Sequence, residues 1–212
     1  MKIIKTIIGV FIPFLSEYKC FSKAKLQASY VEFLKFKIGV SKIYWPVHKT
    51  CTVANVNKIY TGVNCLIGRP GAYLQGAGEL YIGNYVQIAP NVGILTANHD
   101  LYDQRVSNIN KVIIGEYSWV GMNSVILPGV SLGTRTIVAA GSIVTKSFPD
   151  GFCVIGGNPA KVIKQLDKVQ FMPWKDEVEF YGYIPKEVFE RNYPERVRKL
   201  ENELNQLNNK VL

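Results

Sequence analysis

The sequence predicts an all-β body, a parallel β-helix built from stacked six-residue repeats, with short helical extensions at both ends. The first observation is a branched aliphatic residue at every sixth position of the central region. The second is that the next residue is usually small, as at Gly115 and Gly121. The third is a short or branched residue four positions on, such as Ser118 or Ser124. The aliphatic positions are Ile114, Val120, Ile126, Leu132, Val138 and Val144.

A period of six indicates neither an α-helix, whose period is about 3.6, nor a plainly alternating strand. It fits a short strand followed by a tight corner, with one aliphatic side chain turned inward from each strand. Three such strands make one coil of a prism, and parallel coils stack so that the aliphatic side chains form ladders inside it. No coil buries its core alone, so the stack is the folding unit.

The pattern has two interruptions, and the second contains one of the only two histidines. The stretch 67–80 is rich in glycine, and 20 residues separate the aliphatic positions of the interval 94–114. Three repeats would use 18 of them, so we expect about two extra residues to bulge outward, in a protruding loop over 95–113 that holds His99. The six-residue spacing occurs upstream at Ile82, Ile88 and Ile94, and weakly at Val47, Val53, Ile59 and Cys65.

Both ends of the chain are expected to be helical additions to the prism, which ends after Val144. A helix is predicted over 23–38, closed by Gly39. Two more are predicted at 186–192 and from Pro194, the last with an apolar seam at Val197, Leu200, Leu204 and Leu207. The predicted regions are a basic, apolar and partly helical extension (1–44), the β-helix (45–165) and a helical C-terminal extension (166–212).

Residues 1–15 are apolar and carry lysines near their start. They resemble a signal peptide but lack a small-x-small cleavage site, and they are shorter than the about 20 apolar residues that span a bilayer. Two interpretations stay open for them. One is a helix packed on the body or on a neighbouring subunit. The other is an interfacial anchor whose lysines meet lipid headgroups, as a peripheral membrane contact.

Charge and cysteine usage restrict the function classes. The net charge is +9, and residues 1–49 hold nine lysines against two glutamates. No nucleic-acid-binding motif accompanies them, so no nucleic-acid partner is predicted. The four cysteines have no metal-ligand spacing, and no metal is predicted. Scattered cysteines of this kind are usually reduced, which favours a cytoplasmic protein.

Three runs carry a resemblance to a known family: WVGMNSVILPGV (119–130), VAAGSIVTK (138–146) and GNPAK (157–161). They resemble the hexapeptide-repeat acyltransferases. The segment IAPNV (88–92), followed by Asn98 and His99, is similar to the maltose, galactoside and nodulation O-acetyltransferase branch and its relatives in envelope-polysaccharide synthesis. The resemblance implies a left-handed β-helix, a homotrimer, and active sites between neighbouring prisms with acyl-coenzyme A in the groove.

The resemblance also implies that His99 is the catalytic histidine. Acetyl transfer to an alcohol requires that the hydroxyl proton be removed as the oxygen attacks the thioester carbonyl, and imidazole is the usual base near neutral pH. Asp100, Asp103, Glu116 or a backbone carbonyl could orient the ring. Asn98 either faces the acceptor or holds the loop. A cysteine nucleophile is the competing mechanism, but no cysteine lies next to a histidine in sequence.

Contacts to the acyl donor are likewise implied by the resemblance. Trp119 would line the cleft where pantetheine meets the acceptor, and its alternative role is packing against the next coil. The backbone of Ala140 and Gly141 would contact the pantetheine arm, because small residues let a ligand approach closely. The cations expected near the coenzyme A phosphates, otherwise ordinary surface residues, are Lys146, Lys161 and Lys164.

The predicted function is an acetyl-coenzyme A-dependent O-acetyltransferase acting on a saccharide hydroxyl, by direct transfer with His99 as general base. The acceptor would be a cell-envelope or capsular glycan precursor, placed at the inner membrane face, or a small sugar. Three alternatives are an N-acyltransferase of an amino sugar, a non-catalytic scaffold, and a zinc enzyme like the γ-type carbonic anhydrases, which need three histidines per metal. Candidate acceptor residues are Tyr73, Gln75, Tyr102, Asp103 and Arg105.

Overall fold

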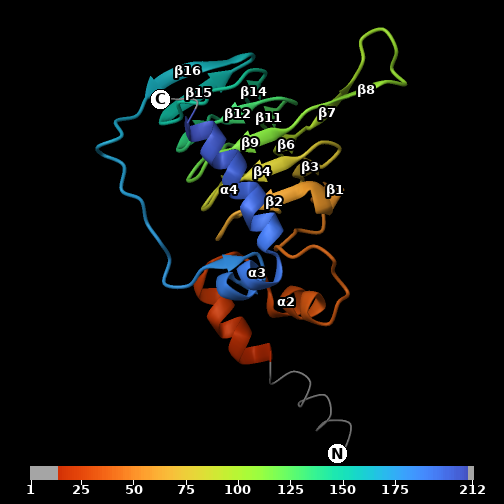
Figure 1. Cartoon of the computed structure of the whole chain (residues 1–212), viewed down its shortest axis with the longest axis vertical. Coiled ribbons are helices and arrows are strands. Elements are labelled where there is room, and N and C mark those ends of the chain that lie inside the picture. Colours follow the sequence, from red (N-terminus) through yellow and green to blue (C-terminus); the bar gives the residue numbers. More distant parts are fainter. Residues whose placement is uncertain (1–13, 210–212) are drawn as a thin grey trace, which may run out of the picture.

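The computed structural model of the chain describes residues 14–209, and its body is a three-sided parallel β-solenoid (Figure 1). We name each side by its first numbered strand. The β1 face contains β1 (Thr52–Ala54), β3 (Tyr73–Gln75), β6 (Gly93–Ile94), β11 (Val125–Ile126) and β14 (Ile143–Val144). The β2 face contains β2 (Ile59–Thr61), β4 (Leu80–Ile82), β9 (Val112–Ile114) and β12 (Ser131–Leu132). The β5 face contains β5 (Gln87–Ile88), β10 (Trp119–Val120), β13 (Thr136–Val138), β15 (Cys153–Gly157) and the antiparallel β16 (Ala160–Gln165).

The predicted aliphatic ladders are confirmed from Ile82 onward. In the first coil the predicted position was wrong, because Thr61 and not Ile59 is in register with Ile82. On the β5 face, Val120 lies in register with Ile88 on one side and Val138 on the other, and all three side chains are buried. The β1 and β2 faces have equivalent ladders, and every one of the six central aliphatic positions is at most 1% exposed. The six-residue period therefore reports one inward position for each strand and corner.

The small and short residues of the repeat lie at the corners, as predicted. A Cβ on Gly115 would lie 2.5 Å from the backbone of Gly133, because successive coils meet there. The buried hydroxyl of Ser118 donates to the Gly133 carbonyl (3.3 Å) and accepts from the backbone N–H of Thr136 (3.2 Å). The hydroxyl thus serves the polar backbone groups that a buried corner would otherwise leave unpaired.

The predicted bulge at His99 is a much larger structure than two extra residues. Ile94 is on the β1 face and Ile114 is on the next face, so their 20-residue separation spans one corner. The same corner takes eight residues from Leu74 to Ile82 and six from Ile126 to Leu132. The surplus forms an antiparallel hairpin, β7 (Ala97–His99) and β8 (Ser107–Ile109), which projects from the solenoid (Figure 1). The prediction of three repeats plus about two extra residues was wrong, because sequence spacing alone cannot distinguish an inserted hairpin from three weakly conforming repeats.

Two other boundaries differ from the prediction. The stack continues past Val144, since β15 pairs in parallel with β13 before β16 turns back along it. The helix expected over 23–38 is shorter: α2 spans Tyr30–Lys37, preceded by a helix whose described part is 14–23. Positive φ angles at Lys25 and Gln27 interrupt the helical path between them.

The C-terminal helices follow the prediction. They are α3 (Lys186–Asn192) and α4 (Pro194–Asn209), and Leu200, Leu204 and Leu207 of α4 pack against the β2 face. The short strands β17 (Phe180–Tyr181) and β18 (Ile184–Pro185) form an antiparallel pair. Phe180 of β17 and Tyr183 between the strands join the N-terminal helices in a second core. A 3₁₀ turn, η1, covers Val56–Lys58.

None of the helices within residues 14–209 is long and apolar enough to cross a membrane. In the same part of the chain, no three His, Cys, Asp or Glu side chains gather in a group that could hold a metal ion. The predicted interfacial or packing role of residues 1–15 falls, up to residue 13, outside the described residues.

Candidate active site

The side chain of His99 is exposed at the end of β7, where His99 pairs with Ser107. Its Nδ1 lies 2.6 Å from the carbonyl oxygen of Gln104. A carbonyl oxygen only accepts hydrogen bonds, so this contact places the ring proton on Nδ1 and leaves the lone pair on Nε2. Among the orienting groups that the sequence left open, the structure has the backbone carbonyl in contact with the ring.

The acidic residues beside His99 hold the turn of the hairpin. One carboxylate oxygen of Asp100 accepts from the backbone N–H groups of Tyr102 (2.9 Å) and Asp103 (3.1 Å). These bonds, with a weaker one from Asn108, stabilise the charged form and keep the pKa of Asp100 below its ordinary value. Asp103 receives two hydrogen bonds from the guanidinium of Arg105. The remaining acidic candidate, Glu116, accepts a hydrogen bond from the Asn84 amide at 2.5 Å.

His99 opens onto a pocket of about 520 Å³ at the root of the hairpin. The sequence singled out His99 and Asn98 from its lining. It gave no sign of Asn108, which faces Asn98 across the hairpin, or of Asn110 and Pro128. The carboxamides are donors and acceptors suited to sugar hydroxyls. The lining is Asn98, His99, Leu101, Asn108, Asn110 and Pro128.

The residues expected to hold the acyl donor lie on another side of the prism. Trp119 is 52% exposed on the β5 face, between Gln87 and Ile137 of the adjacent coils. Ala140 and Gly141 form the corner between the β5 and β1 faces, and a Cβ on Gly141 would meet nothing within 4 Å. The hairpin leaves the corner between the β1 and β2 faces, which is opposite the β5 face. Within one chain, His99 and Trp119 are therefore on opposite sides of the solenoid.

The three predicted phosphate-binding lysines divide in the same way. Lys146 follows β14, so it lies in the corner from which the hairpin departs, and its Nζ is 5.7 Å from the ring centre of Phe148. Lys161 and Lys164 are exposed on β16 of the β5 face. Of these three lysines in the described chain, only Lys146 lies on the hairpin side of the solenoid.

The acceptor candidates do not form one cluster. The amide oxygen of Gln75 accepts from the backbone N–H groups of Thr96 and Ala97, both at 2.9 Å, and so fastens the root of the hairpin. Tyr73 is on the outside of β3, on the β1 face. Tyr102, Asp103 and Arg105 are at the hairpin tip, where Tyr102 is almost fully exposed.

The cysteines are not placed to act as a nucleophile beside His99. All four are free. Burial raises the pKa of Cys65 to about 12 and that of Cys51 to about 11, so both are thiols at neutral pH. None of the four lines the His99 pocket. The other histidine, His48, is hydrogen-bonded through Nδ1 to the Thr50 hydroxyl at 2.9 Å.

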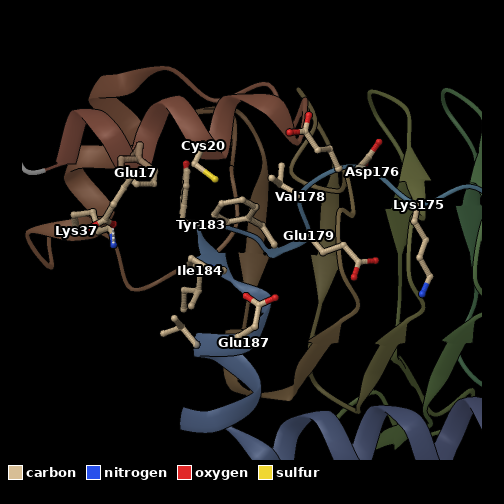
Figure 2. Close-up of a pocket in the computed structure, with 15 residues that line it drawn as sticks. Glu17, Cys20, Lys37, Lys175, Asp176, Val178, Glu179, Tyr183, Ile184 and Glu187 are labelled. Atoms are coloured by element: carbon tan, nitrogen blue, oxygen red, sulfur yellow. Dashed lines mark ion pairs between the residues drawn. The ribbon is translucent and has the colours of Figure 1, made fainter.

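A larger pocket than the one at His99 lies at the base of the solenoid. It has a volume of about 660 Å³ and lies between the N-terminal helices and residues 175–188 (Figure 2). Its floor is apolar, and three of its carboxylates are already paired with lysines. No histidine lines it, which leaves the hairpin pocket as the candidate for acid–base chemistry. The paired carboxylates are Glu17, Glu177 and Glu179.

Comparison with known families agrees with the repeat. The family described as bacterial transferase hexapeptide (six repeats) matches residues 111–146, from β9 to β14. Residues 111–146 of the β-solenoid are thus similar to the hexapeptide-repeat transferases. The chain spans about half the length of the curated relatives it matches.

Several relatives of this hexapeptide-repeat chain are acetyltransferases. The galactoside O-acetyltransferase of Lactococcus lactis is 37% identical over 97 residues, which are 44% of this chain and 46% of the relative. The structure of a maltose O-acetyltransferase from Clostridium difficile 630 aligns with 72% of this chain and 87% of its own, at 27% identity and a TM-score of 0.53. A hexapeptide-repeat acetyltransferase from Vibrio cholerae, solved with acetyl coenzyme A, aligns over 69% and 84%, at 25% identity and a TM-score of 0.54.

Proposed function

We propose that this protein is an acetyl-coenzyme A-dependent O-acetyltransferase that acts on a hydroxyl of a saccharide. The observation that carries the proposal is the hydrogen bond from Nδ1 of His99 to the Gln104 carbonyl, which leaves Nε2 as a base in an accessible pocket. The galactoside and maltose specificities named for two relatives support a sugar acceptor. Acetyl coenzyme A, bound by a third relative, is the proposed donor.

In the proposed reaction, Nε2 of His99 takes the proton of the sugar hydroxyl while the sugar oxygen attacks the thioester carbonyl. The carbon–sulfur bond then breaks, the coenzyme A thiolate leaves, and the imidazolium returns the proton to the sulfur. The products are the sugar acetate and free coenzyme A, so no covalent enzyme intermediate is needed. The Gln104 carbonyl keeps its hydrogen bond throughout and stabilises the transient positive charge on the ring.

The active site is proposed to form between subunits of a homotrimer. His99 and Trp119 are on opposite sides of one solenoid, so a single chain does not bring its base to its donor residues. In a closed ring, the hairpin of one subunit would meet the β5 face of its neighbour. We place the protein in the cytoplasm, because four free thiols suit a reducing compartment. A role in envelope or capsular glycan synthesis at the inner membrane face is part of this proposal.

The assembly is tested by mixing two inactive variants. His99→Ala removes the base, and Ala140→Trp fills the donor groove from an exposed corner position. If each site combines two subunits, random mixed trimers recover about a quarter of the wild-type activity. No recovery after verified subunit exchange would show that each chain carries its own complete site.

The activity is tested by thiol release from acetyl coenzyme A with a panel of sugars and amino sugars. His99→Ala is expected to lower sugar-dependent release by at least about a hundredfold, within the range of about 10²–10⁴ typical of a general base. His48→Ala is the matched control and should retain wild-type activity. Release with amino sugars alone would make the protein an N-acyltransferase. If the wild type releases no thiol and calorimetry detects no coenzyme A binding, the chain is a non-catalytic scaffold.

A further inference from the structure

Helix α2 is apolar on two opposite faces, and only one of them is covered. The inner face packs Phe33 onto Phe21, with ring centres 5.3 Å apart, and stacks Phe36 on Tyr183 at 5.1 Å. A surface helix normally turns a polar face to solvent, and one that is apolar all round is normally buried. The opposite face of α2 differs from an ordinary solvent face because it exposes two aliphatic side chains, Val31 and the C-cap Ile38.

The uncovered surface consists of Val31, Lys35 and Ile38, together with Val40 just beyond the helix. We call it the outer α2 face. The first three are spaced i, i+4 and i+7, which places them on one side of the helix. Val31, Ile38 and Val40 are 59%, 55% and 67% exposed. Figure 2 shows Lys37, on the inner side of α2, turned toward the basal pocket.

The charge around the outer α2 face is positive. Lys35 lies within it and Lys42 follows it in sequence, and neither forms an ion pair in the described part of the chain. The two glutamates of this region are otherwise engaged. Glu17 pairs with Lys37, and Glu32 closes the capping box of α2 with Ser29. Exposed aliphatics among unpaired lysines are the composition of helices that lie on anionic membrane surfaces.

The preceding helix repeats the pattern. Leu15 is 42% exposed and Lys19, four residues later, is also exposed. Both helices lie at the base of the molecule, at the end opposite β16 (Figure 1). A basal surface of this kind could rest on a bilayer while the hairpin and the upper coils stay in water.

We propose that the outer α2 face docks on an anionic lipid surface. Charge complementarity favours lipid over a second copy of the chain, because a two-fold contact would oppose like lysines across the interface. The residues involved are all within the described chain, so the proposal does not depend on residues 1–13. It is also independent of the acetyltransferase proposal, since lipid binding is measured without substrate.

The test is flotation of the full chain with phosphatidylcholine vesicles that contain or lack phosphatidylglycerol. The wild type should float only with the anionic vesicles. Val31→Ser/Ile38→Ser/Val40→Ser should lower the partition coefficient at least tenfold. Lys35→Gln/Lys42→Gln should lower it about 25-fold, because each lysine near an anionic surface contributes about fivefold. Val169→Ser/Met172→Ser, which alters exposed residues of the segment before α3, is the matched control and should float as the wild type does.

The outcomes separate the occupants of this face. If the wild type stays unbound, or if the α2 variants float like the wild type, the proposal is overturned. A loss of oligomer mass in the triple variant would make the face a subunit contact and also overturn it. Circular dichroism melting checks that the variants fold. As a second measurement, the tryptophan fluorescence of Ile38→Trp should shift to shorter wavelength when anionic vesicles are added. The same addition should not shift the fluorescence of Val169→Trp.

Discussion

The imidazole Nδ1 of His99 lies 2.6 Å from the backbone carbonyl oxygen of Gln104, five residues further along the same hairpin. His99, the proposed base, and the carbonyl that fixes its tautomer thus belong to one local element. Because the partner is a backbone atom, its position depends on the turn between the two strands and not on the Gln104 side chain. The first prediction concerns that turn.

Asp100→Ala is expected to lower kcat about 10- to 100-fold with little change in KM for acetyl coenzyme A. The carboxylate accepts two backbone N–H bonds of the turn, and without it the Gln104 carbonyl no longer holds the ring in place. Gln104→Ala is the control and should remain within about twofold of wild type. The measurement is steady-state kinetics of thiol release; equal losses in both variants would contradict this role of the turn.

The proposed donor-binding role of the β5 face gives a separate kinetic prediction. Trp119→Ala should raise KM for acetyl coenzyme A about tenfold while kcat changes less, because an exposed aromatic side chain that lines a cleft mainly contributes to binding. Ile137→Ala, which alters the neighbouring outward side chain in register with Trp119, should have a smaller effect. If the two variants behave alike, Trp119 has no special part in donor binding.

Core ladders and outward positions should differ in the free energy of unfolding. Ile114→Ala removes a fully buried side chain between two coils and should cost about 2–5 kcal/mol. Ile137→Ala, on the outer side of the β5 face, should cost less than about 1 kcal/mol. Urea unfolding at fixed protein concentration compares them, and a similar cost for both would mean that the inward–outward alternation is misassigned.

Thiol reactivity should follow burial. Cys20 is exposed and should react first with a disulfide reagent at pH 8. Cys51 and Cys65 should react far more slowly, since burial raises their pKa values to about 11 and about 12 and leaves little thiolate. Mass spectrometry of time points gives the order. Modification of Cys65 at the rate of Cys20 in the folded protein would be inconsistent with a buried Cys65.

The contact between Glu179 and the solenoid should give a pH-dependent stability. Burial alone would raise the pKa of Glu179, but hydrogen bonds from Lys186 and Tyr85 outweigh it, so the pKa lies below its ordinary value of 4.5. A lowered pKa stabilises the fold above the unfolded-state value and loses that contribution as pH falls through the folded-state value. Glu179→Gln should therefore cost about 1–3 kcal/mol at pH 7 and progressively less below about pH 4.5.

Glu177→Gln is the control for that pH series, because Glu177 forms only an exposed ion pair with Lys23. Its effect at pH 7 should be within about 1 kcal/mol. Thermal melts from pH 3 to pH 7 measure both variants. A Glu179→Gln cost that stays constant over this range would show that the carboxylate charge does not contribute.

Much of the solenoid could be predicted from the sequence because its constraint repeats. Each central strand has a position, such as Val120 or Ile126, whose side chain faces the axis and is aliphatic. In the first coil, the buried Thr61 takes this place in register with Ile82. Some corners, such as the one at Gly115, leave no room for a Cβ. The apolar seam of α4 could also be predicted, since Leu200 and Leu204 recur at helical spacing and pack on the β2 face.

The hairpin could not be predicted in the same way. A 20-residue interval is compatible with a lost coil or with an insertion at a corner, and only strand pairing decides that Ile94 and Ile114 are on adjacent faces. The true length of the insertion follows from that pairing. The partner of His99 could not be predicted either, because it is a backbone carbonyl and every residue type has one.

By itself, the sequence determined the repeating core and showed that His99 lies in an interruption of the repeat. Local periodicity suffices for this, since every coil obeys the same packing condition. Only the tertiary structure decided that Gln75 fastens the hairpin root and that His99 and Trp119 lie on opposite sides of the prism. Those relations depend on which faces successive strands join, and the face of a strand is set by stacking with coils distant in sequence.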